Sequence, residues 1–144
     1  MAKKNAPVLG IDLGTTRSVV AFVDADGKPE TIRNREGDLT TPSVVLFEES
    51  ELTVGKEALK ALSSLPENVA TFVKREMGKE SFSMQFGGDS YSPELISASV
   101  LERLRLDAEA KFGCKVQQAV VSVPAYFDES KRLATINAGL LAGL

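Results

Sequence analysis

The sequence predicts an α/β fold built on a mixed sheet, and three observations indicate this class. Short apolar runs separated by glycine turns fill the first third of the 144 residues. Helical spacing of apolar residues dominates the middle, and a helix–strand–helix pattern closes the chain. Strands first, then a helix, a strand and a helix, are typical of an α/β or α+β domain with a mixed sheet.

The first three strands are predicted from apolar runs. Residues 8–13 and 18–23 are rich in Val, Ile and Leu and are joined by a turn that contains Gly14. A second turn at Gly27 leads to a weakly alternating strand at 29–33, so the three strands are predicted to form an antiparallel meander. Two further strands are expected at 43–47 and 52–54.

Helical patterns follow. A short helix is expected at 56–63 and another at 66–78, because apolar side chains recur there at helical spacing. The run 81–90 has two glycines and little pattern, and is interpreted as a reduced hairpin or a loop. The longest helix begins at Ser92-Pro93-Glu94, a capping hydroxyl followed by a first-turn proline and a carboxylate, and Gly113 ends it.

The last strand and the last helix are close together. Residues 119–123 are almost continuously apolar, which is typical of a strand buried on both faces. Pro124 ends this strand, and Asp128 is well placed to cap a helix that continues to about Leu141.

Composition excludes several classes of function. The 17 basic and 20 acidic side chains give a net charge of −3, so no nucleic-acid or membrane partner is expected. The absence of histidine and the single cysteine, Cys114, exclude histidine-dependent triads, the common zinc sites and an intramolecular disulfide. The basic start leads into no long apolar stretch, so no signal peptide is expected and a cytoplasmic location is predicted.

The turn Asp12-Leu13-Gly14-Thr15-Thr16 is the first candidate site. Glycine permits a close approach, and successive backbone N–H groups with two threonine hydroxyls can surround an anion. A carboxylate at a strand end is suited to ordering water around Mg²⁺. Taken alone, the pentapeptide is better explained as an ordinary hairpin turn, because it has neither a Walker pattern nor a G-x-G-x-x-G motif.

Three more residues are weaker candidates. Lys74 adjoins an apolar stripe and could aim its ammonium into a cleft, although a surface lysine is the commoner outcome. Pro124 would normally mark only the end of a strand, and Arg132 in a first helical turn would normally face solvent. Asp107 and Glu109 are interpreted as surface charges that nothing pairs as acid and base.

Several segments are more informative together than apart. They are Ile11–Ser18, Glu36–Ser43, Val54–Gly55, Phe72–Arg75, Ser92–Ala98, Val121–Phe127, Ala138–Gly139 and Ala142–Leu144. In this order they resemble segments of the DnaK-type heat-shock chaperones, the heat-shock-70 class. The resemblance covers the chain from about Val8 to its last residue.

The resemblance implies an actin-like, ribonuclease H-like ATPase fold, of which this chain is similar to lobe I only. It implies a core subdomain at 1–42 and 113–144, with a smaller subdomain inserted at 43–112. The implied function is that of the amino-terminal part of a chaperone that hydrolyses ATP to ADP and phosphate. In the intact protein, peptide substrates, a J-domain protein and a nucleotide-exchange factor would be partners. Because the second lobe is missing, the chain alone is expected to be inactive.

The same resemblance implies roles for individual residues. Asp12 would hold Mg²⁺ through water, and Lys74 would act in catalysis by positioning the γ-phosphate and the attacking water. Pro124 and Arg132 would lie on the path that links nucleotide state to substrate binding. The ATP phosphates would be held by Gly14, Thr15, Thr16 and Arg17.

Three positions depart from the family pattern. Arg17 stands where asparagine is usual, Leu39 replaces a usual arginine, and Ile136 stands where bacterial members often carry a relay lysine. Two alternatives remain open at this point. One is another actin-like branch, either a filament-forming bacterial actin or a sugar kinase; the other is a non-enzymatic remnant that binds partners.

Overall fold

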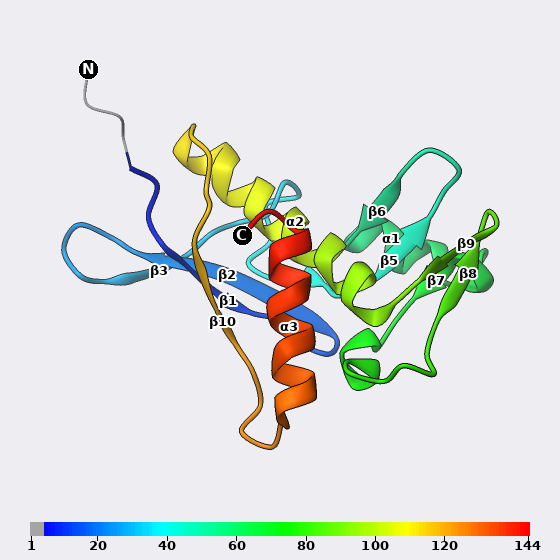
Figure 1. The fold of residues 1–144 in the computed structure, drawn as a ribbon. Helices are drawn as coiled ribbons and strands as arrows, with labels where there is room; N and C mark the ends of the chain where they lie inside the picture. Colours follow the sequence, from blue (N-terminus) through cyan, green and yellow to red (C-terminus); the bar gives the residue numbers. More distant parts are fainter. Residues whose placement is uncertain (1–4) are drawn as a thin grey trace.

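The computed structural model describes residues 5–144. This part of the chain contains both strands and helices (Figure 1). The basic start Met1–Lys4, for which no signal peptide is predicted, lies outside the described residues. The largest sheet contains both parallel and antiparallel pairs, so the predicted α/β class with a mixed sheet is confirmed. Within residues 5–144, no helix combines the length and the apolar character needed to cross a membrane.

Five strands make up the largest sheet: β1 (Leu9–Asp12), β2 (Arg17–Val23), β3 (Pro29–Thr31), β4 (Thr41–Pro42) and β10 (Ala119–Ser122). The first three form the predicted antiparallel meander, and β10 pairs with β1 in parallel. Strand β4 was not predicted, and it pairs with the start of β2. This sheet therefore brings together the beginning and the end of the chain.

A second, three-stranded sheet lies at the other end of the molecule. It has the order β6 (Leu52–Val54), β5 (Val45–Phe47) and β7 (Val69–Ala70), and helix α1 (Lys56–Ala61) packs against it. Strands β8 (Met84–Phe86) and β9 (Asp89–Tyr91) form a separate hairpin. Of the two interpretations given for residues 81–90, the hairpin is therefore the right one.

Two long helices pack against each other, and both begin at the predicted caps. Helix α2 (Pro93–Phe112) starts where Ser92 Oγ accepts the N–H of Leu95 at 3.2 Å, and it ends at Gly113 with a φ of 67°. Helix α3 (Glu129–Leu141) starts where Asp128 Oδ1 accepts the N–H of Lys131 at 2.9 Å. Figure 1 shows α2 running from the first sheet toward β5–β9, with α3 beside β10.

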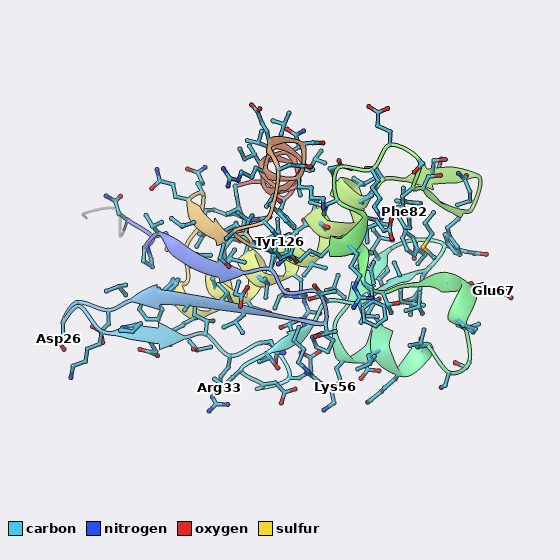
Figure 2. All side chains as sticks on the ribbon, turned by 90° about the horizontal axis from the view of Figure 1, so that it is seen from below. Asp26, Arg33, Lys56, Glu67, Phe82 and Tyr126 are labelled. Atoms are coloured by element: carbon cyan, nitrogen blue, oxygen red, sulfur yellow. The ribbon has the colours of Figure 1, made fainter. Side chains whose placement is uncertain are left out.

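The hydrophobic core is continuous along α2. Its most deeply buried large side chains come from both sheets, from α2 and from the segment before Gly78, and they include Leu9, Ile11, Phe47, Met77, Leu101 and Leu104. Figure 2 shows the side chains around this core, with Asp26 and Glu67 at opposite ends of the molecule. The division into 1–42 with 113–144 and an inserted 43–112 stays a prediction.

The predicted helix at 66–78 is wrong. The segment forms two short 3₁₀ turns, Pro66–Asn68 and Val73–Glu76, with strand β7 between them. Val69 and Ala70 pair with β5, and Phe72 adopts a left-handed φ of 56°, which no helix interior accepts. Pairing with a distant strand has overridden a local helical pattern.

The prediction that strand 119–123 is buried on both faces is also wrong for this chain. Strand β10 is the edge of its sheet, and Val120 is 69% exposed. The apolar residues at 119–123 indicated burial, but only β1 pairs with this strand among the described residues.

Candidate functional site

The site is built on the turn that joins β1 to β2. Gly14 lies at its centre, where a Cβ atom would be 1.9 Å from the carbonyl oxygen of Arg17. No side chain fits in that space, so glycine is required by close backbone approach. The turn therefore has the tight geometry expected from its sequence.

Two serines hold this turn from behind. Ser18 Oγ accepts the N–H of Gly14 at 3.3 Å, and Ser43 Oγ donates to the carbonyl of Gly14 at 2.9 Å. The two hydroxyl oxygens are 2.8 Å apart, and the N–H of Ser43 donates to the carbonyl of Thr16 at 2.9 Å. Neither serine was singled out from the sequence as a site residue. Each ends a segment that carried the family resemblance, which is the one signal that pointed to them.

The front of the turn carries unused donors. Within residues 5–144, the backbone N–H groups of Thr15 and Thr16 have no hydrogen-bond partner. Thr16 is exposed and Thr15 is half-buried, so both amides lie at or near the surface. Two adjacent free N–H groups are the elements from which a backbone anion site is made.

Asp12 ends strand β1 beside this turn. Its carboxylate is exposed, and Oδ1 accepts the hydroxyl of Ser122 at 3.1 Å. Residues that face each other across paired strands share a sheet face, so Asp12, Val19 and Ser122 lie on the same side. Arg17, two residues before Val19 on β2, belongs to this face as well.

Lys74 approaches the turn from the second 3₁₀ turn, not from the helix that the sequence predicted. Its ammonium donates to the carbonyl of Leu13 and lies 5.8 Å from the ring centre of Phe127. Lys74, Gly14 and Thr15 line the same small cavity of about 10 Å³. Burial lowers the pKa of Lys74, and the nearby charge of Asp12 opposes that shift. The structure thus brings Lys74 and Asp12 to the same turn.

Arg17 extends along the surface next to the turn. Its Nη1 donates to the hydroxyl of Thr40 at 3.3 Å, and the side chain is exposed. The cation therefore lies near the turn without being held tightly there.

Pro124 and Arg132 lie away from the turn. Pro124 is half-buried at the start of the β10–α3 loop, and its carbonyl accepts the N–H of Phe127. Figure 2 places Tyr126, also in this loop, at the near end of α3. Arg132 is exposed and borders a groove of about 380 Å³ between β10 and α3. Phe127 is the link between this loop and Lys74.

Asp107 and Glu109 are not surface charges, so that interpretation is wrong. Asp107 is 5% exposed and pairs with Arg103 at 3.0 Å. Burial raises the pKa of Asp107 to about 6, although the charge of Arg35 acts in the opposite direction. Glu109 pairs with Arg105 at 2.7 Å and accepts the N–H of Val116 at 3.0 Å. Asp107 therefore pairs within α2, whereas Glu109 also secures the helix to the segment that follows it.

Known proteins resemble this chain over nearly its whole length. The family model described as Hsp70 protein matches residues 8–144. The chain is 45% identical over 136 residues to Chaperone protein DnaK of Halobacterium salinarum, which covers 94% of this chain and 22% of that relative. It is 44% identical over 145 residues to Chaperone protein DnaK of Thermotoga maritima and of Thermotoga petrophila, covering 100% of this chain and 24% of each relative. The chain thus spans less than a quarter of the length of these curated relatives.

Proposed function

Because the chain belongs to the Hsp70 family, we propose that it is the amino-terminal, phosphate-binding part of an ATP-dependent chaperone. Its mixed sheet and helices are consistent with an incomplete actin-like ATPase lobe of that family. The observation that carries the proposal is the Gly14 turn, whose free amides at Thr15 and Thr16 lie close to Asp12 and Lys74. An anion acceptor, a carboxylate and an ammonium at one point are the groups that phosphate chemistry requires.

Asp12 fits the part of a magnesium-holding carboxylate. Oδ2 of Asp12 accepts no hydrogen bond from the described residues, so this oxygen is free for a water ligand of an ion. Mg²⁺ keeps several water ligands and is commonly held by only one or two carboxylates together with phosphate oxygens, so the single carboxylate of Asp12 suits this part. When bound, Mg²⁺ would neutralise charge on the phosphate oxygens.

Lys74 fits the part of a positioned cation. Its ammonium has three protons, and the carbonyl of Leu13 fixes the direction of one of them. The remaining protons can reach an anionic oxygen bound at the turn. Partial burial strengthens such a charge-assisted hydrogen bond, because less water competes for the ammonium. In this proposal Lys74 orients the γ-phosphate and the attacking water and stabilises the developing charge.

The proposed substrates and partner proteins follow from membership of the Hsp70 family. Peptide substrates, a J-domain protein and a nucleotide-exchange factor would act on the intact protein, and Pro124 and Arg132 would lie between the nucleotide and those partners. The contact of Phe127 with Lys74 supports a path through the β10–α3 loop. The single, half-buried Cys114 suits a reducing compartment, so we keep the cytoplasm as the proposed location.

The family match favours the chaperone over a bacterial actin or a sugar kinase, which the sequence reasoning left open. One observation supports the remaining alternative, a remnant that only binds partners. Strand β10 exposes Val120 on one face of the sheet, and on the other face helix α3 exposes Ile136 and Leu140 beside an apolar groove. A chain with this surface can associate with a partner whether or not it turns over ATP.

Calorimetry with Mg-ATP, Mg-GTP and magnesium pyrophosphate tests the proposal. We expect weak binding of all three with similar affinity, because the contacts offered by this chain are to phosphate and not to the base. Asp12→Asn should remove most of the Mg²⁺ dependence and leave the fold intact, since it preserves shape and removes one charge. Absence of binding, or identical Mg²⁺ titrations for Asp12→Asn and the parent, would overturn the proposal.

A further inference from the structure

Two buried hydroxyl groups behind the turn carry a further inference. Ser18 is 0% exposed and Ser43 is 9% exposed, although they are 25 residues apart in sequence. Each contacts the other serine and one end of Gly14. Buried hydroxyls with two partners each are part of a fixed network.

The direction of each hydrogen bond follows from counting protons. A serine hydroxyl has one proton to donate. Ser43 uses its proton on the carbonyl of Gly14, which can only accept. In the 2.8 Å contact between the two hydroxyls, Ser18 must therefore donate and Ser43 must accept. Ser18 Oγ in turn accepts the N–H of Gly14. The bonds form a closed ring that leaves Gly14 through its N–H and returns to its carbonyl.

We infer that Ser18 and Ser43 are positioning residues that withdraw the Gly14 N–H from the ligand and direct a phosphate to the amides of Thr15 and Thr16. The N–H of Gly14 is engaged in the ring, while the next two amides have no partner within residues 5–144. Because both ends of Gly14 are fixed from behind, the peptide planes that follow it are held in one orientation. This inference rests on the proposed function, since it specifies which atoms of the turn bind phosphate.

Opening the ring at either serine should have the same effect. Ser18→Ala leaves the N–H of Gly14 without its acceptor, and Ser43→Ala leaves the carbonyl of Gly14 without its donor. Unmatched buried polar groups are costly, so the turn will relax to satisfy them with water. Once the ring is open, removal of the second hydroxyl has little left to break, and the two substitutions should be strongly non-additive.

The experiment is a titration of the ¹⁵N-labelled chain with magnesium tripolyphosphate, followed residue by residue by NMR. In the parent, the amide signals of Thr15 and Thr16 should move and that of Gly14 should move far less. Ser18→Ala and Ser43→Ala should each weaken binding about tenfold, which corresponds to about 1.4 kcal/mol. The double variant should bind about as weakly as either single one. The matched control is Thr135→Val, which removes another buried hydroxyl, on α3 and away from the turn.

Each outcome has a defined meaning. Parent-like binding by both single variants, additive losses in the double variant, or a Gly14 shift as large as that of Thr15 would overturn the inference while the phosphate site stands. A parent that does not respond to tripolyphosphate at all would overturn the proposed function and the inference with it. If the alanine variants do not fold, hydrogen exchange of the free parent decides. Slow exchange at Gly14 with fast exchange at Thr15 and Thr16 supports the ring, and equal rates contradict it.

Discussion

Strand β1 lies between β2 and β10, and these two sides of the sheet differ in how many contacts the chain makes there. Toward β2, the chain closes on itself through the Gly14 turn, the buried serines and the ammonium of Lys74. Toward β10, the sheet stops at an open edge with Val120 exposed and an apolar groove beside α3. The polar groups of the proposed site are thus held in place on the β2 side, whereas on the other side no strand among residues 5–144 covers β10.

The largest expected effect concerns Asp107, a buried carboxylate on α2, the helix that packs against both sheets. Burial raises the pKa of Asp107 to about 6 from an ordinary 3.8, so its charged form is disfavoured in the folded chain. The contribution to stability is full below pH 4 and is lost as pH rises through 6, by ~3 kcal/mol at most. Asp107→Asn should flatten this part of the pH dependence. Urea unfolding between pH 4 and 7 measures it, with Asp26→Asn, an exposed carboxylate, as control. Equal slopes in parent and Asp107→Asn would contradict the effect.

Lys74 tests whether the closed side acts in catalysis. A chimera that joins this chain to the remaining three-quarters of the Thermotoga maritima relative has the full length of that relative. In that chimera, Lys74→Ala should slow single-turnover ATP hydrolysis about a hundredfold, the usual cost of one positioned charge donor. ATP affinity should fall much less, because the group acts mainly on the transition state. Arg75→Ala, at the exposed neighbouring position, is the control. A loss below about tenfold, ~1.4 kcal/mol, would return Lys74 to a purely structural role.

The open side should make the chain self-associate. Leu9 donates its N–H to the carbonyl of Gln118, so in a parallel ladder the backbone groups of Ala119 and Val121 face the free edge. Such an edge pairs with other strands. Val120→Lys should weaken association about tenfold in sedimentation equilibrium, because a charge at an edge opposes strand pairing. Val23→Lys, at an exposed valine of β2, is the control. A parent that stays monomeric and binds no hydrophobic dye would refute this prediction.

The smallest expected effect concerns Arg17. Its guanidinium lies at the surface with one 3.3 Å contact to Thr40, so its attraction for a bound phosphate is screened by solvent. Arg17→Gln should weaken tripolyphosphate binding about threefold at low salt, within the range of exposed ion pairs. The difference should vanish at high salt. Arg33→Gln is the control, because Arg33 is also exposed and also makes one hydrogen bond. No change at low salt would show that the cation is irrelevant to the turn.

Local signals predicted the parts of the fold that are local. The turn at Gly14, the meander and the caps at Ser92 and Asp128 each depend on residues a few positions apart, and all were predicted. The helix at 66–78 failed because Ala70 pairs with Val45, a partner that no local pattern reveals. Residues 119–123 suggested full burial because their apolar character is typical of a central strand, whereas β10 pairs only with β1 among residues 5–144.

The same distinction holds for the site. A short motif made Asp12 and Gly14 candidates, and an apolar stripe made Lys74 one, but only the family resemblance gave these residues roles. The ring of Ser18 and Ser43 joins segments 25 residues apart, and the burial of Asp107 depends on a loop that folds over α2. Contacts of this kind are a property of the assembled structure, so composition and spacing do not show them.

The parallel pairing of β1 with β10 has a consequence for how the protein folds during its synthesis on the ribosome. Asp12 meets Ser122, 110 residues later in the chain. At typical synthesis rates of 5–20 residues per second, β10 is therefore synthesised roughly 5 to 20 seconds after β1, and until then one edge of β1 is unpaired. During that time β1 has an unpaired, apolar edge that can pair with strands of other chains. A protein of a chaperone family thus passes through a stage at which it would itself profit from a chaperone.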